Sequence, residues 1–154
     1  MSPLREVGQR WLVLVGGGAL LLAMATDGIA VIGRHIGHPL LGSIEIIQAA
    51  VLVAGCASLV VATLAGVHAR VHLLVDRLPT PGRDLLARAG MLAGALLFAS
   101  LAVASAWIAA DLWAGHEESE WLHVPYRPLR IIAVAAALTV AGGFIVAAQR
   151  RRAP

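Results

Sequence analysis

Charged residues are scarce in this sequence, and lysine is absent from it. Charged side chains make up 14% of the 154 residues, whereas a soluble globular domain usually carries about 25%. The chain is instead 59% hydrophobic, and its mean hydropathy is +0.82. A chain with so few charges is not expected to cover a water-facing surface, so this composition excludes an ordinary soluble domain.

The sequence has a single cysteine and none of the residue sets commonly used in catalysis. The single cysteine, Cys56, has no second thiol with which to form an intramolecular disulfide, so it gives no indication of the redox compartment. The sequence contains no Ser/His/Asp nucleophile set, no phosphate-binding glycine loop and no cysteine cluster. We therefore expect no catalytic residue, no metal site and no cofactor, and we do not expect an enzyme.

Four long apolar runs account for most of the chain. They cover residues of about 11–32, 40–67, 85–113 and 131–148. A membrane-spanning helix needs roughly 17–25 mostly apolar residues to cross the hydrocarbon core, and each run meets that length. The runs show no alternation of period two, which argues against a membrane β-barrel. The sequence predicts an all-α integral membrane protein with four transmembrane helices, forming a single domain over residues 1–154.

The basic residues are distributed unevenly between the two sides of this four-helix plan. One side, with both termini and the loop between the second and third runs, carries Arg5, Arg10, Arg70, Arg77, Arg83, Arg88, Arg150, Arg151 and Arg152. The opposite side carries Arg34, Arg127 and Arg130. Because arginine-rich loops stay in the cytoplasm, both termini and the central loop are predicted to be cytoplasmic. The pI of 10.4 therefore reflects topology, and no nucleic-acid partner is expected.

The first apolar run has an alternative interpretation as a cleavable signal peptide. Arg5, Arg10 and the apolar run behind them, with Ala23-Met24-Ala25 as a cleavage site, fit that pattern. Residues 28–32, however, continue the apolar run past the candidate site to spanning length. We expect the first helix to be retained; cleavage would leave three helices in the same orientation.

Asp27 and Glu45 are carboxylates that lie inside apolar runs, toward the predicted outer ends of their helices. Glu45 also falls in the first turns of the second run, where the helix dipole favours a negative group. One interpretation is structural, with the carboxylate paired to an arginine such as Arg34 or to one on a partner. The other is proton or cation coupling, because ionisable residues within the membrane often mark transport pathways.

Two histidines, His68 and His72, share a helical face at the predicted cytoplasmic end of the second run. Spacing of this kind can support a metal or haem site. No second histidine pair lies at matching depth on another run, so we expect interfacial histidines without a cofactor.

Gly90 and Gly94 form a small-xxx-small pattern in the third run. Small residues at this spacing allow two membrane helices to approach closely. The pattern predicts helix packing without indicating whether the partner helix belongs to the same chain.

Three stretches together resemble the small permease subunit of tripartite ATP-independent periplasmic (TRAP) transporters. They are Arg34 with residues 38–45 (HPLLGSIE), residues 68–79 (HARVHLLVDRLP), and residues 118–125 (ESEWLHVP) with Pro128-Leu129-Arg130. The order and spacing of these stretches across four helices carry the resemblance, which covers nearly the whole chain. The chain departs from the family pattern at His72, where an aspartate is usual.

The resemblance implies a function that the residues alone do not show. In that family a substrate-binding protein captures an organic acid in the periplasm, and a large membrane subunit moves it inward using an ion gradient. The small subunit binds the large one as a scaffold. The chain would then be a multi-pass protein of the bacterial inner membrane. Its partners would be the large multi-span permease subunit, the periplasmic substrate-binding protein and membrane lipid.

The resemblance also suggests which residues contribute to the partner interface. They are Arg34, Glu45, His68, Arg70, Asp76 and Arg77, with Ser119 and Pro125 positioning the outer loop. Two other functions remain as alternatives: a membrane-bound haem or redox subunit using His68 or His72, and a stand-alone small transporter using Asp27 and Glu45. Polar residues are few in the middle of the apolar runs, which favours the scaffold over a transport pathway.

Overall fold

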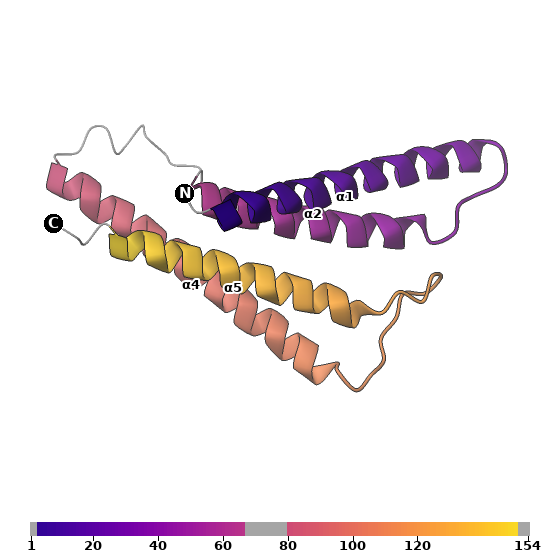
Figure 1. The fold of residues 1–154 in the computed structure, drawn as a ribbon. Coiled ribbons are helices and arrows are strands. Elements are labelled where there is room, and N and C mark those ends of the chain that lie inside the picture. The colour runs from indigo at the N-terminus through magenta and orange to yellow at the C-terminus, as the bar shows by residue number, and fades with distance from the viewer. Residues whose placement is uncertain (1–2, 67–79, 151–154) are drawn as a thin grey trace.

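The structure is a computed structural model that describes residues 3–66 and 80–150, and this part of the chain forms four helices (Figure 1). They are α1 (Pro3–His35), α2 (Ser43–Ala65), α4 (Thr80–Asp111) and α5 (Tyr126–Arg150). Each is long and apolar enough to cross a membrane, over Glu6–His35, Ser43–Ala65, Gly82–Asp111 and Tyr126–Gln149. The prediction of an all-α membrane protein with four spanning helices is confirmed.

The helices differ from the predicted runs mainly at their ends. α1 and α5 extend beyond the runs into residues 3–10 and 126–130, because a helix continues into polar flanks that a hydropathy pattern leaves out. α2 begins later than predicted, at Ser43 instead of residue 40. The residue before it, Gly42, has a φ of 76°, in the left-handed region, so the regular helix cannot start earlier.

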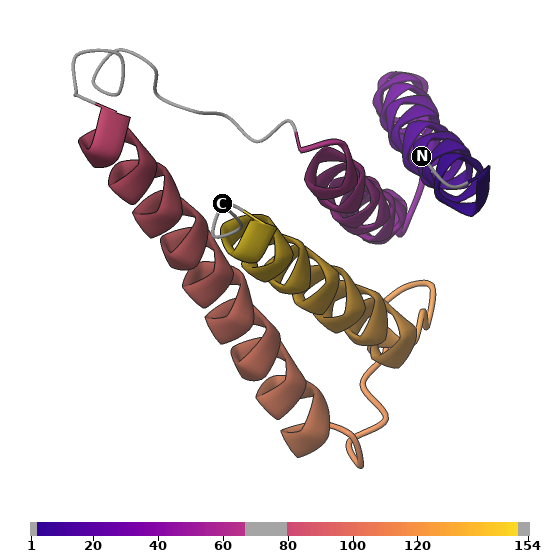
Figure 2. The same cartoon turned by 60° about the vertical axis from the view of Figure 1, so that its left-hand side comes forward.

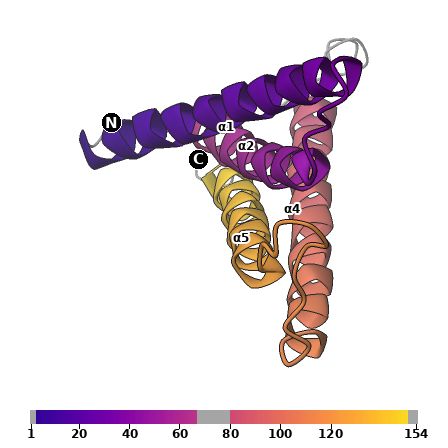
Figure 3. The same cartoon turned by 90° about the vertical axis from the view of Figure 1, so that its right-hand side faces the viewer.

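The four helices form two antiparallel hairpins that meet along one seam. α1 packs on α2, α4 packs on α5, and α2 packs on α5, which runs in the same direction (Figures 1 and 2). Figure 3 shows α1 and α4 spreading away from the α2–α5 seam in different directions. The described helices are therefore an open row in the order α1, α2, α5, α4, not a closed bundle.

Small residues fill the seams between the helices. The buried alanines are Ala23, Ala30, Ala50, Ala54, Ala57, Ala95, Ala102, Ala136 and Ala141. Val140 is a larger side chain at the seams, and its exposed fraction is 0%. Because lipid tails are as apolar as the side chains, helices in a membrane associate through close packing, and alanine lets their backbones approach.

A glycine lies at each of the three seams. An added Cβ would lie 3.1 Å from Ala57 Cβ at Gly16 in the α1–α2 seam, 2.9 Å from a ring carbon of Phe144 at Gly94 in the α4–α5 seam, and against the Thr63 methyl group at Gly143 in the α2–α5 seam. The packing role predicted for Gly94 is confirmed. Its motif partner Gly90 has no heavy atom within 4 Å of its Cβ position, so the motif contributes through one glycine.

Most of the helix surface stays outside these seams. Only 17–22% of each spanning window is buried within the chain, so the remaining apolar surface has to meet lipid or another protein. Large side chains lie on these faces, among them Leu96 and Trp107, which are 73% and 75% exposed.

Candidate functional site

The α4–α5 loop folds back on itself where the resemblance placed Ser119. The Ser119 amide donates to the Val124 carbonyl oxygen at 3.0 Å, and the Val124 amide donates to Ser119 Oγ at 3.0 Å. Between them, His123 takes a positive φ of 52°, which turns the chain back. Ser119 is 3% exposed. These bonds close a short loop and hold its tip, residues 120–123, in place.

Glu45 holds this loop tip from the first turn of α2. Its Oε1 accepts a hydrogen bond from the Trp121 amide at 2.8 Å, and its Oε2 accepts one from the Leu122 amide at 2.9 Å. Both bonds are strengthened by the carboxylate charge, and the N-terminal end of a helix favours a negative group. The carboxylate therefore ties the α4–α5 hairpin to the α1–α2 hairpin.

Gly42 provides the surface on which Leu122 rests. An added Cβ at Gly42 would lie 2.6 Å from Leu122 Cγ, and Gly42 also has a φ of 76°. A side chain here would meet both a steric and a backbone penalty, so the position requires glycine. Gly42, Glu45, Ser119, Leu122 and Val124 together are called the clasp below.

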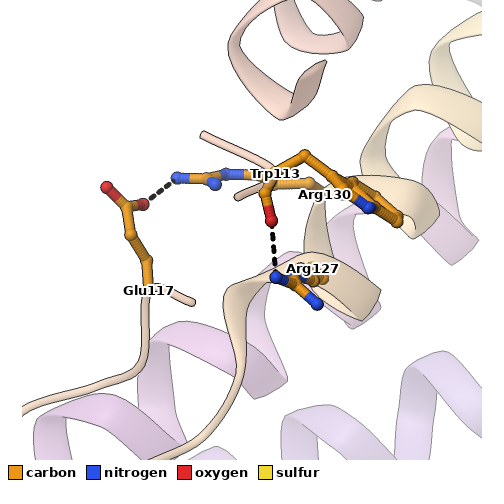
Figure 4. A network of polar contacts seen from close by, with 4 residues as sticks. All are labelled: Trp113, Glu117, Arg127 and Arg130. Carbon is orange, nitrogen blue, oxygen red and sulfur yellow. Dashed lines mark hydrogen bonds and ion pairs between the residues drawn. The ribbon is translucent and has the colours of Figure 1, made fainter. Parts of the chain in front are cut away.

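Two arginines of α5 fix the loop from its other side (Figure 4). Arg130 Nη2 forms an ion pair with Glu117 Oε2 at 2.5 Å. Arg127 Nη2 donates to the Trp113 carbonyl oxygen at 2.5 Å, and its guanidinium carbon lies 5.3 Å from the centroid of the Trp113 ring. The first turns of α5 are thus connected to the segment that follows α4.

A cavity of about 480 Å³ opens beside the clasp, between α2, α4 and α5. Its polar lining includes Glu45, Gln48, Ser105, Glu117 and Arg130. The charged members already have partners, since Glu45 accepts from the loop amides and Glu117 pairs with Arg130. In the described ranges, no three His, Cys, Asp or Glu side chains gather as a metal ion would need. The arrangement is built to hold segments together.

Glu45 and Ser119 lie close together in the structure. Neither their spacing in the sequence nor the composition of the chain could predict this. Pro125 belongs to the same loop and forms an isolated antiparallel bridge with Glu118 at its base. Arg34 lies exposed at the end of α1, and within the described residues it makes no ion pair with Glu45. The suggested pairing of Glu45 with Arg34 is thus not formed, and the carboxylate accepts from two backbone amides instead. The alternative, an arginine on a partner, stays a prediction.

Four of the predicted interface residues fall outside the described residues: His68, Arg70, Asp76 and Arg77. His72 also falls outside them. Asp27, the carboxylate in the first apolar run, lies exposed on α1. The interface roles suggested for His68, Arg70, Asp76 and Arg77 stay predictions.

Sequence reasoning missed Gly42, Leu122 and the Arg130–Glu117 pair. Part of the signal was present, because Glu45 stands three residues after Gly42, the spacing of a capping glutamate. A capping glutamate normally reaches back to its own helix start. Glu45 instead reaches an amide 76 positions away in the chain, and only the folded structure brings the two together.

Replacing Glu45 by glutamine should loosen the loop. The amide group of glutamine offers one acceptor oxygen where the carboxylate offers two, and its NH2 group would face a backbone N–H instead of accepting from it. We expect a cysteine introduced at Glu120 to react faster with a water-soluble maleimide in the Glu45→Gln variant. The matched control is Glu118→Gln, which removes a negative charge from the exposed side of the same loop. Equal labelling rates in the two variants would show that Glu45 does not hold the loop.

Comparison with known proteins matches the chain to a protein family. The sequence profile described as "Tripartite ATP-independent periplasmic transporters, DctQ component" matches residues 21–153. No curated protein and no solved structure matches the chain. The matched range contains α2, α4, α5, the C-terminal part of α1 from residue 21 on and every residue of the clasp.

Proposed function

Because the chain belongs to the DctQ component family of tripartite ATP-independent periplasmic transporters, we propose that it acts as the scaffold for the large permease subunit. In this role it takes part in the ion-gradient-driven uptake of organic acids, which a periplasmic binding protein delivers. Members of this family are components of a transporter, and the family is not a class of enzyme. The protein is accordingly a multi-pass membrane protein, and the bacterial inner membrane is its proposed location.

The observation that carries the scaffold role is the open helix row. Only 17–22% of each spanning window is buried within the chain, so long apolar faces remain for another protein to cover. The clasp and the α2–α5 seam fix the relative position of the two hairpins. A preformed row of this kind offers a partner a fixed surface without an entropic cost of ordering the hairpins.

The state of Glu45 supports the scaffold over a stand-alone transporter. An ion-coupling carboxylate has to exchange its partner, whereas both oxygens of Glu45 accept bonds from the loop. We propose that Arg34 and Glu45 contribute to the interface from the loop end of the row, where Ser119 and Pro125 position the outer loop. His68, Arg70, Asp76 and Arg77 are proposed to contribute from the segment between α2 and α4, on the strength of the family resemblance.

The proposed topology places both termini and the segment between α2 and α4 in the cytoplasm. A membrane-impermeant maleimide added from the periplasmic side should label a cysteine introduced at Glu120, beside Ser119. It should not label one at Asp84, near Thr80, until the membrane is opened with detergent. Both positions are exposed, so access to water does not separate them. The reverse labelling pattern would overturn the orientation that the arginines predict.

The scaffold role itself is tested by reconstitution. We expect the purified chain alone to move no organic acid into liposomes, to co-purify with a large permease, and to support uptake only with that permease and the binding protein. Omitting each component in turn is the control. Solute flux through this chain alone would support a small transporter instead. A haem absorption spectrum from the purified chain would support the redox alternative.

A further inference from the structure

A second cavity, a groove of about 590 Å³, runs along the face of the α4–α5 hairpin. Its walls are almost entirely apolar and mostly small: Ala106, Ala109 and Ala110 on α4, with Val134, Ala135 and Leu138 on α5. Ala106, Ala110 and Ala135 are exposed, so nothing within the described chain covers them. A groove of this kind cannot stay empty within a bilayer and has to hold apolar matter.

The groove is confined to one half of the bilayer. On α5 it extends from Ile131 to Leu138, which corresponds to about 10 Å along the helix axis at 1.5 Å per residue. It begins close to the point where the spanning segment of α5 starts, at Tyr126. The hydrocarbon core is about 30 Å thick, so each leaflet contributes about 15 Å. A spanning partner helix would use the full length of the hairpin, whereas a lipid acyl chain stays within one leaflet.

A positive charge lies at the mouth of the groove. Trp113 is the lining residue at that end, and the guanidinium carbon of Arg127 lies 5.3 Å from its ring centroid (Figure 4). Among the described residues Arg127 has no carboxylate partner, unlike Arg130, which pairs with Glu117. The charge of Arg127 is therefore left for an anion from outside this part of the chain, at the level where lipid headgroups lie.

We propose that this groove binds one phospholipid, with the lipid phosphate on Arg127 and one acyl chain along the alanines of α4 and α5. Arginine suits a phosphate because its guanidinium presents several donors to the phosphate oxygens. The alanine walls leave the width that an acyl chain fills. The site goes beyond the scaffold role and does not depend on it, since it is formed by this chain alone.

Lipid titration of the full chain in detergent micelles, followed by native mass spectrometry, tests the site. The probes are phosphatidylglycerol and a diacylglycerol with the same acyl chains, which lacks the phosphate. We expect Arg127→Gln to weaken phosphatidylglycerol binding about tenfold or more, because it removes a charge-assisted contact. Arg127→Lys keeps the charge but not the planar set of donors, so it should weaken binding less than Arg127→Gln does. Diacylglycerol should bind the wild-type chain more weakly and should not respond to Arg127→Gln.

Filling the groove tests the position of the acyl chain. Ala135→Leu places a larger side chain among the lining residues and should weaken binding of both probes severalfold. The matched control is Ala104→Leu on α4, which lengthens an exposed alanine outside the groove lining and should leave binding within twofold. Gel filtration of each variant confirms that it is folded before binding is compared.

Two results would overturn the proposal. Unchanged phosphatidylglycerol affinity in either Arg127→Gln or Ala135→Leu would mean that the lipid does not occupy this groove. Loss of co-purification with the large permease in Ala135→Leu, with lipid affinity intact, would assign the groove to a helix of that subunit. The second result would leave the scaffold role standing, and failure of the scaffold role in reconstitution would leave the lipid titration unaffected.

Discussion

Replacing Gly42 by alanine is expected to detach the α4–α5 loop from α2 and to give one of the largest losses of stability of any single-methyl change in the chain. The φ of 76° costs an L-residue roughly 1–2 kcal/mol. The new Cβ would also lie 2.6 Å from Leu122 Cγ, and overpacking of this kind costs about 1–3 kcal/mol more. The measurement is the free energy of unfolding in mixed detergent micelles, together with maleimide labelling of a cysteine at Glu120.

Gly37 provides a control that separates the two causes. It has nearly the same φ, 77°, but its Cβ position has no heavy atom within 4 Å. Gly37→Ala should therefore show the backbone cost of about 1–2 kcal/mol alone and leave loop labelling unchanged. Adding Leu122→Ala to Gly42→Ala should recover the steric part. Equal losses in Gly37→Ala and Gly42→Ala, with no change in labelling, would mean that Leu122 does not hold the loop on α2.

The four spans could be predicted because hydropathy is a local property of the sequence. Twenty apolar residues in a row signal a crossing wherever they occur in a fold. The helix ends could not be placed as well, since they depend on backbone geometry such as that of Gly42. The order of the helices across the row was not predictable either. Short loops make sequential helices neighbours, but they do not decide whether α2 or α1 faces α5.

The residues at the α1–α2 seam show which part of helix packing a sequence pattern can predict. On α1 the buried small residues are Gly16, Ala23, Thr26, Ala30 and Gly33, at the spacings of three, four and seven typical of a packed helix face. Gly17 and Gly18 are equally small and remain exposed. The composition therefore indicates several faces of α1 that could pack against another helix. The position of the partner helix determines which of these faces is buried.

The candidate site was predictable in part for a similar reason. A carboxylate in an apolar run is unusual enough to single out Glu45, and the family resemblance singled out Ser119. Neither signal could connect them, because the donors to Glu45 are backbone amides, which every residue carries. A site built from main-chain donors leaves no trace in residue identity. The expectation of an arginine partner followed from looking for a side chain of opposite charge.

A single methyl group added at the α2–α5 seam is also expected to lower the free energy of unfolding, through steric overlap alone. Gly143→Ala would place a Cβ against the Thr63 methyl group. Thr63 cannot rotate away freely, because it is β-branched and its Oγ1 donates to the Leu59 carbonyl oxygen at 2.8 Å. We expect the two hairpins to separate near this contact, with a loss of about 1–3 kcal/mol in the free energy of unfolding.

Two further variants test whether the loss arises from this contact: alanine at the neighbouring Gly142, and a conservative change at Thr63. Gly142→Ala adds the same methyl group one position earlier, into open space, and should be neutral or stabilising by about 0.5–1 kcal/mol through helix propensity. Thr63→Ser removes the colliding methyl group and keeps the hydroxyl that bonds Leu59. The double variant Gly143→Ala with Thr63→Ser should therefore regain most of the lost stability. If serine restores nothing, the loss does not arise from contact between Gly143 and Thr63, and α2 and α5 are not held together at this point.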